Sequence, residues 1–103
     1  MSQTVLQNAI WQTVAALPKG RVTNYGEIAK RCGYPGYARF VGYTLKYLPS
    51  DSTLPWHRVI KANGVLAFPL GSPKFEQQKA LLEAEGVIVT GDKVKMRQYF
   101  WDE

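Results

Sequence analysis

The sequence predicts a mainly helical domain with one or two small β hairpins. Apolar residues recur at helical spacing in three segments, and two glycine-containing turns lie among short apolar runs in the C-terminal half. The chain has 103 residues, is 46% hydrophobic and has no low-complexity stretch. Its length and composition favour one domain over residues 1–103, with a modest single core.

The first two helices are predicted from apolar spacing and from residues typical of helix ends. In the first helix, four apolar residues recur at helical intervals: Leu6, Ile10, Val14 and Leu17. Residues 18–20 are Pro-Lys-Gly, which ends this helix. Asn24, followed three positions later by Glu27, starts a short second helix from about Tyr25 to Arg31.

A tight turn at Cys32-Gly33 leads into a third helix, predicted from about Gly36 to Leu48. Val41, Leu45 and Leu48 mark its buried side. Two helices joined by a short turn with glycine are typical of a helix-turn-helix. The start of the second helix faces nucleic acid in that motif, and here it is residues 37–39, Tyr-Ala-Arg.

The C-terminal half is predicted to hold one helix between two hairpins. Asn63-Gly64 lies between the apolar runs 59–61 and 65–67, which favours a hairpin. Ser72-Pro73 starts a helix that ends at Gly86, with Phe75, Leu81 and Leu82 facing inward. Residues 90–92 close a second hairpin between 87–89 and 93–96. The predicted layout is a winged helix-turn-helix.

Positive charge is concentrated in the middle of the chain. Residues 1–18 carry no charged side chain, residues 19–61 carry eight Lys/Arg against two acidic residues (+6), and residues 62–103 carry five against six (−1), which sum to the net +5. A basic segment in a near-neutral frame is typical of a nucleic-acid binder. A solvated surface is the alternative explanation.

The remaining composition indicates a reducing, cytoplasmic setting. No apolar run approaches the ~20 residues that a membrane span needs, and the first residues do not resemble a signal peptide. The single cysteine, Cys32, cannot form an internal disulfide. We expect a monomer without metal or cofactor, cytoplasmic and nucleoid-associated when bound to DNA.

Four colinear segments resemble one known family. Residues 55–59, Pro-Trp-His-Arg-Val, are similar to the Pro-Cys-His-Arg-Val motif of O6-alkylguanine-DNA alkyltransferases, with Trp56 in the place of the reactive cysteine. Residues 20–29 resemble that family's turn and first motif helix, residues 38–42 its Ala-Arg-Ala-Val-Gly recognition helix, and residues 81–86 the end of its last helix. The closest description is the alkyltransferase-like family, whose members carry a non-cysteine residue here.

Trp56 determines what chemistry the resemblance allows. Alkyl transfer needs a thiolate nucleophile, whereas an indole offers an N–H donor and a π face. The chain is therefore predicted not to be an enzyme and to have no catalytic residue. Trp56 could contact a flipped base, because base–aromatic stacking contributes ~1–3 kcal/mol. The alternative is a core tryptophan that fills a disused pocket.

The resemblance also implies roles for other residues. Arg39 would enter the base stack in place of the flipped nucleotide, and a planar guanidinium suits that task. A simple phosphate contact is the alternative for Arg39. Tyr25 would lie beside the rotated nucleotide, in the lesion pocket with Trp56 and Val59, or it would be a structural tyrosine at the core edge. His57 and Glu85 match the proton relay of the enzymes and are interpreted as its structural remnant.

The resemblance thus implies DNA damage recognition. The protein would bind duplex DNA, flip O6-alkylguanine into a pocket without transferring the alkyl group, and mark the lesion for nucleotide-excision repair proteins. A lesion-independent winged-helix DNA binder or regulator is the alternative. Two departures from the enzymes bear on the pocket: Leu48-Pro49 replaces Asn-Pro, and the loop 65–73 lacks a Tyr-Ser pair and contains Phe68, Pro69 and Leu70.

Overall fold

The computed structural model describes residues 3–49 and 51–102. Its helices are α1 (Gln3–Ala15), α2 (Tyr25–Arg31), α3 (Ala38–Lys46), α4 (Pro73–Ala84) and α5 (Met96–Tyr99), with a 3₁₀ turn η1 (Trp56–Arg58). Its strands are β1 (Thr23–Asn24), β2 (Val59–Ile60), β3 (Val89–Thr90) and β4 (Lys93–Val94). The fold is mainly helical with small sheets, as the sequence predicts.

Local residues explain where α2 and α4 begin. The Asn24 side chain accepts a hydrogen bond from the Glu27 N–H at 2.8 Å, and the Ser72 hydroxyl accepts one from the Phe75 N–H at 3.2 Å. Both are N-cap interactions that satisfy a free N–H in the first helical turn. Pro73 occupies the first position of α4, where its missing N–H costs nothing.

Helix α3 is shorter at both ends than the predicted span 36–48. Gly36 has φ +93°, outside the helical region, so α3 begins at Ala38. At the other end, Leu48 precedes a proline, which disfavours helical backbone, and α3 ends at Lys46. Helices α2 and α3 form the predicted helix-turn-helix.

The hairpin predicted around Asn63-Gly64 forms only at its turn, and the strand pairing predicted between residues 59–61 and 65–67 does not extend beyond Lys61 and Val65. The Gly64 N–H donates to the Lys61 carbonyl at 3.0 Å and closes the turn, and the Lys61 N–H donates to the Val65 carbonyl at 2.9 Å. Strand β2, however, pairs in parallel with β1, in the register Thr23 with Val59. The segment after the turn meets β4 through an isolated bridge between Val65 and Lys93. The second predicted hairpin does form, because β3 and β4 pair antiparallel around Gly91.

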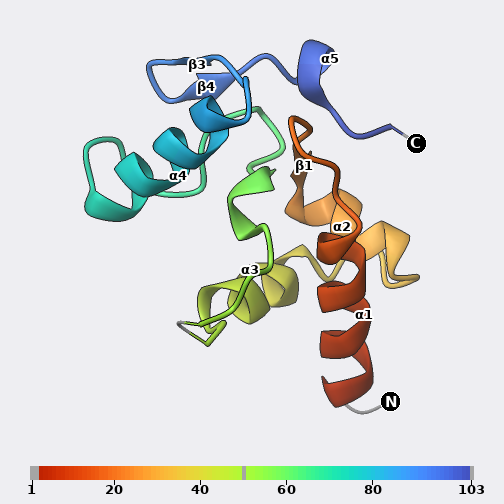
Figure 1. Cartoon of the computed structure of the whole chain (residues 1–103). Helices are drawn as coiled ribbons and strands as arrows, with labels where there is room; N and C mark the ends of the chain where they lie inside the picture. Colours follow the sequence, from red (N-terminus) through yellow and green to blue (C-terminus); the bar gives the residue numbers. More distant parts are fainter. Residues whose placement is uncertain (1–2, 50, 103) are drawn as a thin grey trace.

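The core consists of two clusters that meet at β2. Successive residues of a strand face opposite sides. Val59 accordingly packs with α1, α2 and α3, whereas Ile60 packs with α4 and the β3–β4 hairpin. Figure 1 shows these two groups of elements with η1 between them. The parallel pair β1–β2 therefore fixes how the helix-turn-helix sits relative to α4.

One residue on α4 has the opposite burial from that predicted. Leu81 is 36% exposed, whereas Gln78 is fully buried. Phe75, Gln78 and Leu82 follow the spacing of a single helix face, and all three are buried. No helix among the described residues is both long enough and apolar enough to cross a membrane.

Candidate functional site

A cavity of about 620 Å³ lies between the helix-turn-helix and α4. Its wall combines residues from α2, α3, η1, α4 and the loops that join them: Tyr25, Gly42, Leu45, Lys46, Leu48, Pro49, Ser52, Trp56, Ala67, Phe68, Lys74 and Gln77. The elements come from distant parts of the sequence, and β1–β2 pairing holds the two halves of the wall together. A space of this size falls in the range of small-molecule sites.

Tyr25 forms the wall on the side of the helix-turn-helix. It is the first residue of α2, and its ring packs against α3 at Gly42. A Cβ built on Gly42 would lie 3.8 Å from two ring carbons of Tyr25, an ordinary van der Waals distance, so the ring packs directly against this turn of α3. Burial raises the pKa of Tyr25 to about 12. The phenol therefore stays neutral and keeps its hydrogen for donation.

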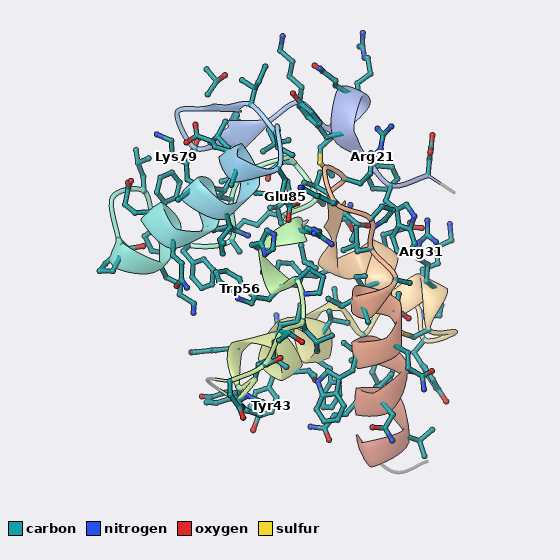
Figure 2. All side chains as sticks on the ribbon, in the orientation of Figure 1. Arg21, Arg31, Tyr43, Trp56, Lys79 and Glu85 are labelled. Atoms are coloured by element: carbon teal, nitrogen blue, oxygen red, sulfur yellow. The ribbon has the colours of Figure 1, made fainter. Side chains whose placement is uncertain are left out.

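Trp56 forms the wall on the other side of the cavity. Its ring stands edge-on to Phe68, with centroids 5.9 Å apart, and Figure 2 shows it between α3 and α4. The Lys74 ammonium lies 4.5 Å from the centroid of the indole, in the range of a cation–π interaction. Trp56 is half-buried, so part of its surface is open to the cavity.

A hydrogen-bonded cluster beneath η1 holds Trp56 in place. Arg58 donates to both oxygens of Glu85, from Nε to Oε1 at 2.9 Å and from Nη2 to Oε2 at 2.6 Å, and Oε2 also lies 2.8 Å from His57 Nε2. The Gly20 N–H also donates to Glu85, and Arg58 Nη1 donates to the Leu17 carbonyl at 2.7 Å. The cluster thus ties η1 to the end of α1 and to the end of α4.

Glu85 is ionised over the ordinary pH range. Burial alone would raise the pKa of Glu85, but hydrogen bonds from Arg58, from His57 and from the Gly20 N–H lower it to about 2. Glu85 is therefore a carboxylate that neutralises Arg58. The Glu85 carboxylate holds the His57 ring by a hydrogen bond. Because His57 follows Trp56 directly in η1, this contact also helps to fix the position of Trp56.

Gln78 is a second buried polar support, and the sequence analysis missed it. Its Nε2 donates to the carbonyls of His57 and Val59, both at 3.1 Å, and its Oε1 accepts from the Ala67 N–H at 3.0 Å. Gln78 thereby ties η1 to the loop that carries Phe68. The helical spacing of Phe75, Gln78 and Leu82 is a signal that could have identified it.

The predicted site residues fall into four places. Tyr25 and Trp56 line the cavity, and His57 and Glu85 lie in contact beneath it. Val59 is fully buried in the core; its N–H donates to the Trp56 carbonyl, its carbonyl accepts from Gln78, and it is not among the described residues that line the cavity.

Arg39 lies apart from the cavity wall, on the surface. It is exposed, it is the second residue of α3, and it has no hydrogen bond or ion pair with the rest of the described chain. An unpaired guanidinium at the start of α3 is free to contact nucleic acid. Tyr43 and Tyr47, further along α3, are also exposed, and their rings pack with centroids 4.8 Å apart.

The single cysteine is in another part of the fold. Cys32 follows α2, is half-buried, and its sulfur lies 3.4 Å from the Thr13 hydroxyl. It is not among the described residues that line the cavity. Within the same part of the chain, no three His, Cys, Asp or Glu side chains are grouped as metal ligands.

The family model for the 6-O-methylguanine DNA methyltransferase DNA-binding domain matches residues 5–87. The chain belongs to this family, among its alkyltransferase-like members. It is 47% identical to the "DNA base-flipping protein" of Escherichia coli, over 90% of this chain and 71% of that protein. It is 38% identical to Schizosaccharomyces pombe alkyltransferase-like protein 1, over 89% and 90%.

Solved structures of the family confirm the predicted fold. The S. pombe protein Atl1, in complex with damaged DNA containing O6-carboxymethylguanine, matches with a TM-score of 0.92 at 35% identity over the whole of both chains. Mycobacterium tuberculosis OGT in complex with DNA matches with a TM-score of 0.68 at 39% identity, over 78% of this chain and 48% of that one. The shorter match indicates that this chain corresponds to part of the methyltransferase.

Proposed function

We propose that this protein recognises O6-alkylguanine in duplex DNA, flips it into the cavity beside Trp56, and holds it without transferring the alkyl group. The observation that carries the proposal is the cavity itself, which lies between the helix-turn-helix and α4 and has three aromatic residues in its wall, Tyr25, Trp56 and Phe68. Relatives of this chain are named for base flipping, and one is solved with damaged DNA.

The proposed route uses two neighbouring positions of α3, one helical turn apart. The unpaired Arg39 lies at its start, where it can fill the gap that the flipped nucleotide leaves in the stack. Gly42, one helical turn later, lies at the cavity with the ring of Tyr25 packed against it. One short helix therefore connects the base stack with the pocket. An alkylated, mispaired guanine costs less to unstack than a paired one, which favours damaged sites.

The chemistry of the cavity supports holding over transfer. Among the described lining residues there is no thiol, and an indole is not a nucleophile that accepts an alkyl group. The chain's cysteine contacts Thr13 instead. The cluster of His57, Arg58 and Glu85 then has a supporting role, because it fixes the short turn that carries Trp56.

The test is equilibrium binding to two matched duplexes, one with a central O6-methylguanine and one with guanine. We expect a preference for the lesion of about ten-fold or more, which corresponds to about 1.4 kcal/mol. Equal affinities with the same salt dependence would support the alternative, a lesion-independent winged-helix DNA binder. Intact-protein mass spectrometry after incubation should show no added methyl group.

We further propose that the bound protein marks the lesion for nucleotide-excision repair. A protein that holds a lesion without repairing it needs a second activity to remove the damage. The measurement is the rate of dual incision of an O6-methylguanine duplex by purified nucleotide-excision repair proteins. Preformed complex should raise that rate, and an Arg39→Ala control should not. An unchanged or slower rate with the unaltered protein would contradict the coupling.

A further inference from the structure

The charged residues that line the cavity, within the described part of the chain, are both cations. Lys46 extends from the last turn of α3, and Lys74 extends from the first turn of α4, so they approach the cavity from its two sides. The lining includes no Asp or Glu. The remaining polar groups of the wall are neutral: Tyr25, Ser52 and Gln77.

Neither lysine is neutralised by the protein. The ion pairs of the described chain join Arg31 with Glu27 and join Glu85 with His57 and Arg58, and Lys46 and Lys74 have no partner of this kind. Each ammonium instead lies over an aromatic ring, Lys74 at 4.5 Å from the Trp56 centroid and Lys46 at 5.7 Å from that of Tyr47. Cation–π contacts hold a positive charge in position without cancelling it.

Lys74 is the better placed of the two cations. Its ammonium lies over the ring of Trp56, and the proposed function places the flipped base beside that ring. The four-carbon stem of lysine also lets the ammonium move toward a new partner. A negatively charged group that enters the cavity would therefore gain an ion pair that no neutral group can form.

We propose that Lys74, assisted by Lys46, makes the cavity select guanines whose O6 substituent carries a negative charge over guanines with a neutral substituent of the same size. The proposal rests on the proposed function, since it names the class of lesion that the same cavity prefers. A carboxymethyl group is the simplest such substituent, because its carboxylate is ionised at neutral pH.

A second anion could occupy the same place, namely a phosphate next to the flipped nucleotide. That phosphate is present whatever the O6 substituent is. Loss of Lys74 would then weaken binding of every duplex by the same factor, whereas a contact with the substituent itself weakens binding of the charged adduct alone. The ratio of two affinities distinguishes these sources.

The experiment measures dissociation constants for duplexes that contain O6-carboxymethylguanine, its neutral amide O6-carbamoylmethylguanine, or guanine, at one ionic strength. The unaltered protein should bind the carboxymethyl duplex about five-fold more tightly than the carbamoylmethyl duplex, as a partly exposed ion pair predicts. Lys74→Gln should bring that ratio to about one, and Lys74→Arg should preserve most of it. Lys79→Gln is the matched control, because Lys79 lies on α4 away from Trp56 and outside the cavity wall.

Three outcomes would overturn the proposal. A ratio near one in the unaltered protein would mean that the cavity ignores the charge of the substituent. A Lys74→Gln variant that weakens all three duplexes equally would make Lys74 a phosphate contact. If neither adduct is bound more tightly than guanine, the proposed function fails as well, and the guanine duplex separates this result from the other two.

Discussion

Replacement of Glu85 by glutamine should destabilise the protein strongly, although the two side chains have the same shape. Glu85 and Arg58 are 11% and 15% exposed, so their ion pair is largely shielded from water. Glu85→Gln would leave the guanidinium of Arg58 without an anion, and breaking a buried pair from one side costs about 3–5 kcal/mol. We expect about 3 kcal/mol, because the Leu17 carbonyl remains as a partner for Arg58.

The pKa of Glu85 gives a similar value for this loss in the free energy of unfolding. Folding lowers it from 4.5 to about 2, and at 1.36 kcal/mol per unit this corresponds to about 3 kcal/mol. A carboxyl whose pKa is lower in the folded state stabilises the fold above its unfolded pKa and loses that contribution as the pH falls toward its folded pKa. The contribution of Glu85 is therefore complete above about pH 4.5 and is lost between about pH 4.5 and 2.

Urea unfolding at pH 7, and again across the acid range, measures both effects. Glu27→Gln is the matched control, since Glu27 pairs with Arg31 at 3.2 Å within α2 and both side chains are more exposed, at 25% and 23%, and a helical pair of this spacing contributes about 0.5 kcal/mol. The reasoning would be refuted if the two variants lost equal stability at pH 7. It would also be refuted if Glu85→Gln and the unaltered protein lost stability in parallel below pH 4.5.

Three further predictions concern DNA binding, alkyl transfer and the fold. Arg39→Ala should lower affinity for an O6-methylguanine duplex more than for a guanine duplex in a binding titration; equal losses would leave Arg39 a phosphate contact. Trp56→Cys should not by itself give an efficient transferase, because the loop 65–73 differs from that of the enzymes, and rapid methylation of the new thiol seen by mass spectrometry would contradict this. Gly64→Ala should destabilise the fold, because Gly64 has φ +86° and its Cβ would lie 2.7 Å from the Val94 carbonyl oxygen. Gly71→Ala is the control, because Gly71 has a similar φ but open space around it, and it should lower the free energy of unfolding by only about 1 kcal/mol. Urea unfolding should show a larger loss for Gly64→Ala, and equal losses would show that the contact with Val94 relaxes freely.

The sequence predicts those elements whose stabilising contacts are local. The second and fourth helices begin where Asn24 and Ser72 cap them, and each cap acts on a residue three positions away. The hairpin predicted at Asn63-Gly64 forms only at its turn, since β2 pairs with β1 and Val65 bridges to Lys93, both far away in the sequence. Turn chemistry marks a change of direction, but it does not decide which strands pair.

The restriction to local contacts also explains which residues of the site could be predicted from the sequence. Residues that match a motif, such as Tyr25 and Trp56, were assigned from the resemblance, and both line the cavity. Lys74 was missed, because its place over Trp56 depends on the path of the loop that precedes α4. Arg58 lies inside the motif, yet its hydrogen bonds to Glu85 and to the end of α1 depend on tertiary packing that no local pattern records.

Nuclear magnetic resonance of a duplex with an isotope-labelled O6-methyl group would test the central claim most directly. If the base is flipped into the cavity, the methyl protons should show nuclear Overhauser contacts to the rings of Trp56 and Tyr25, which wall it. Ring currents from those aromatics should also move the methyl resonance on binding. Contacts only to neighbouring bases, with the protein saturated, would show that the alkylated guanine stays in the stack and would contradict the account.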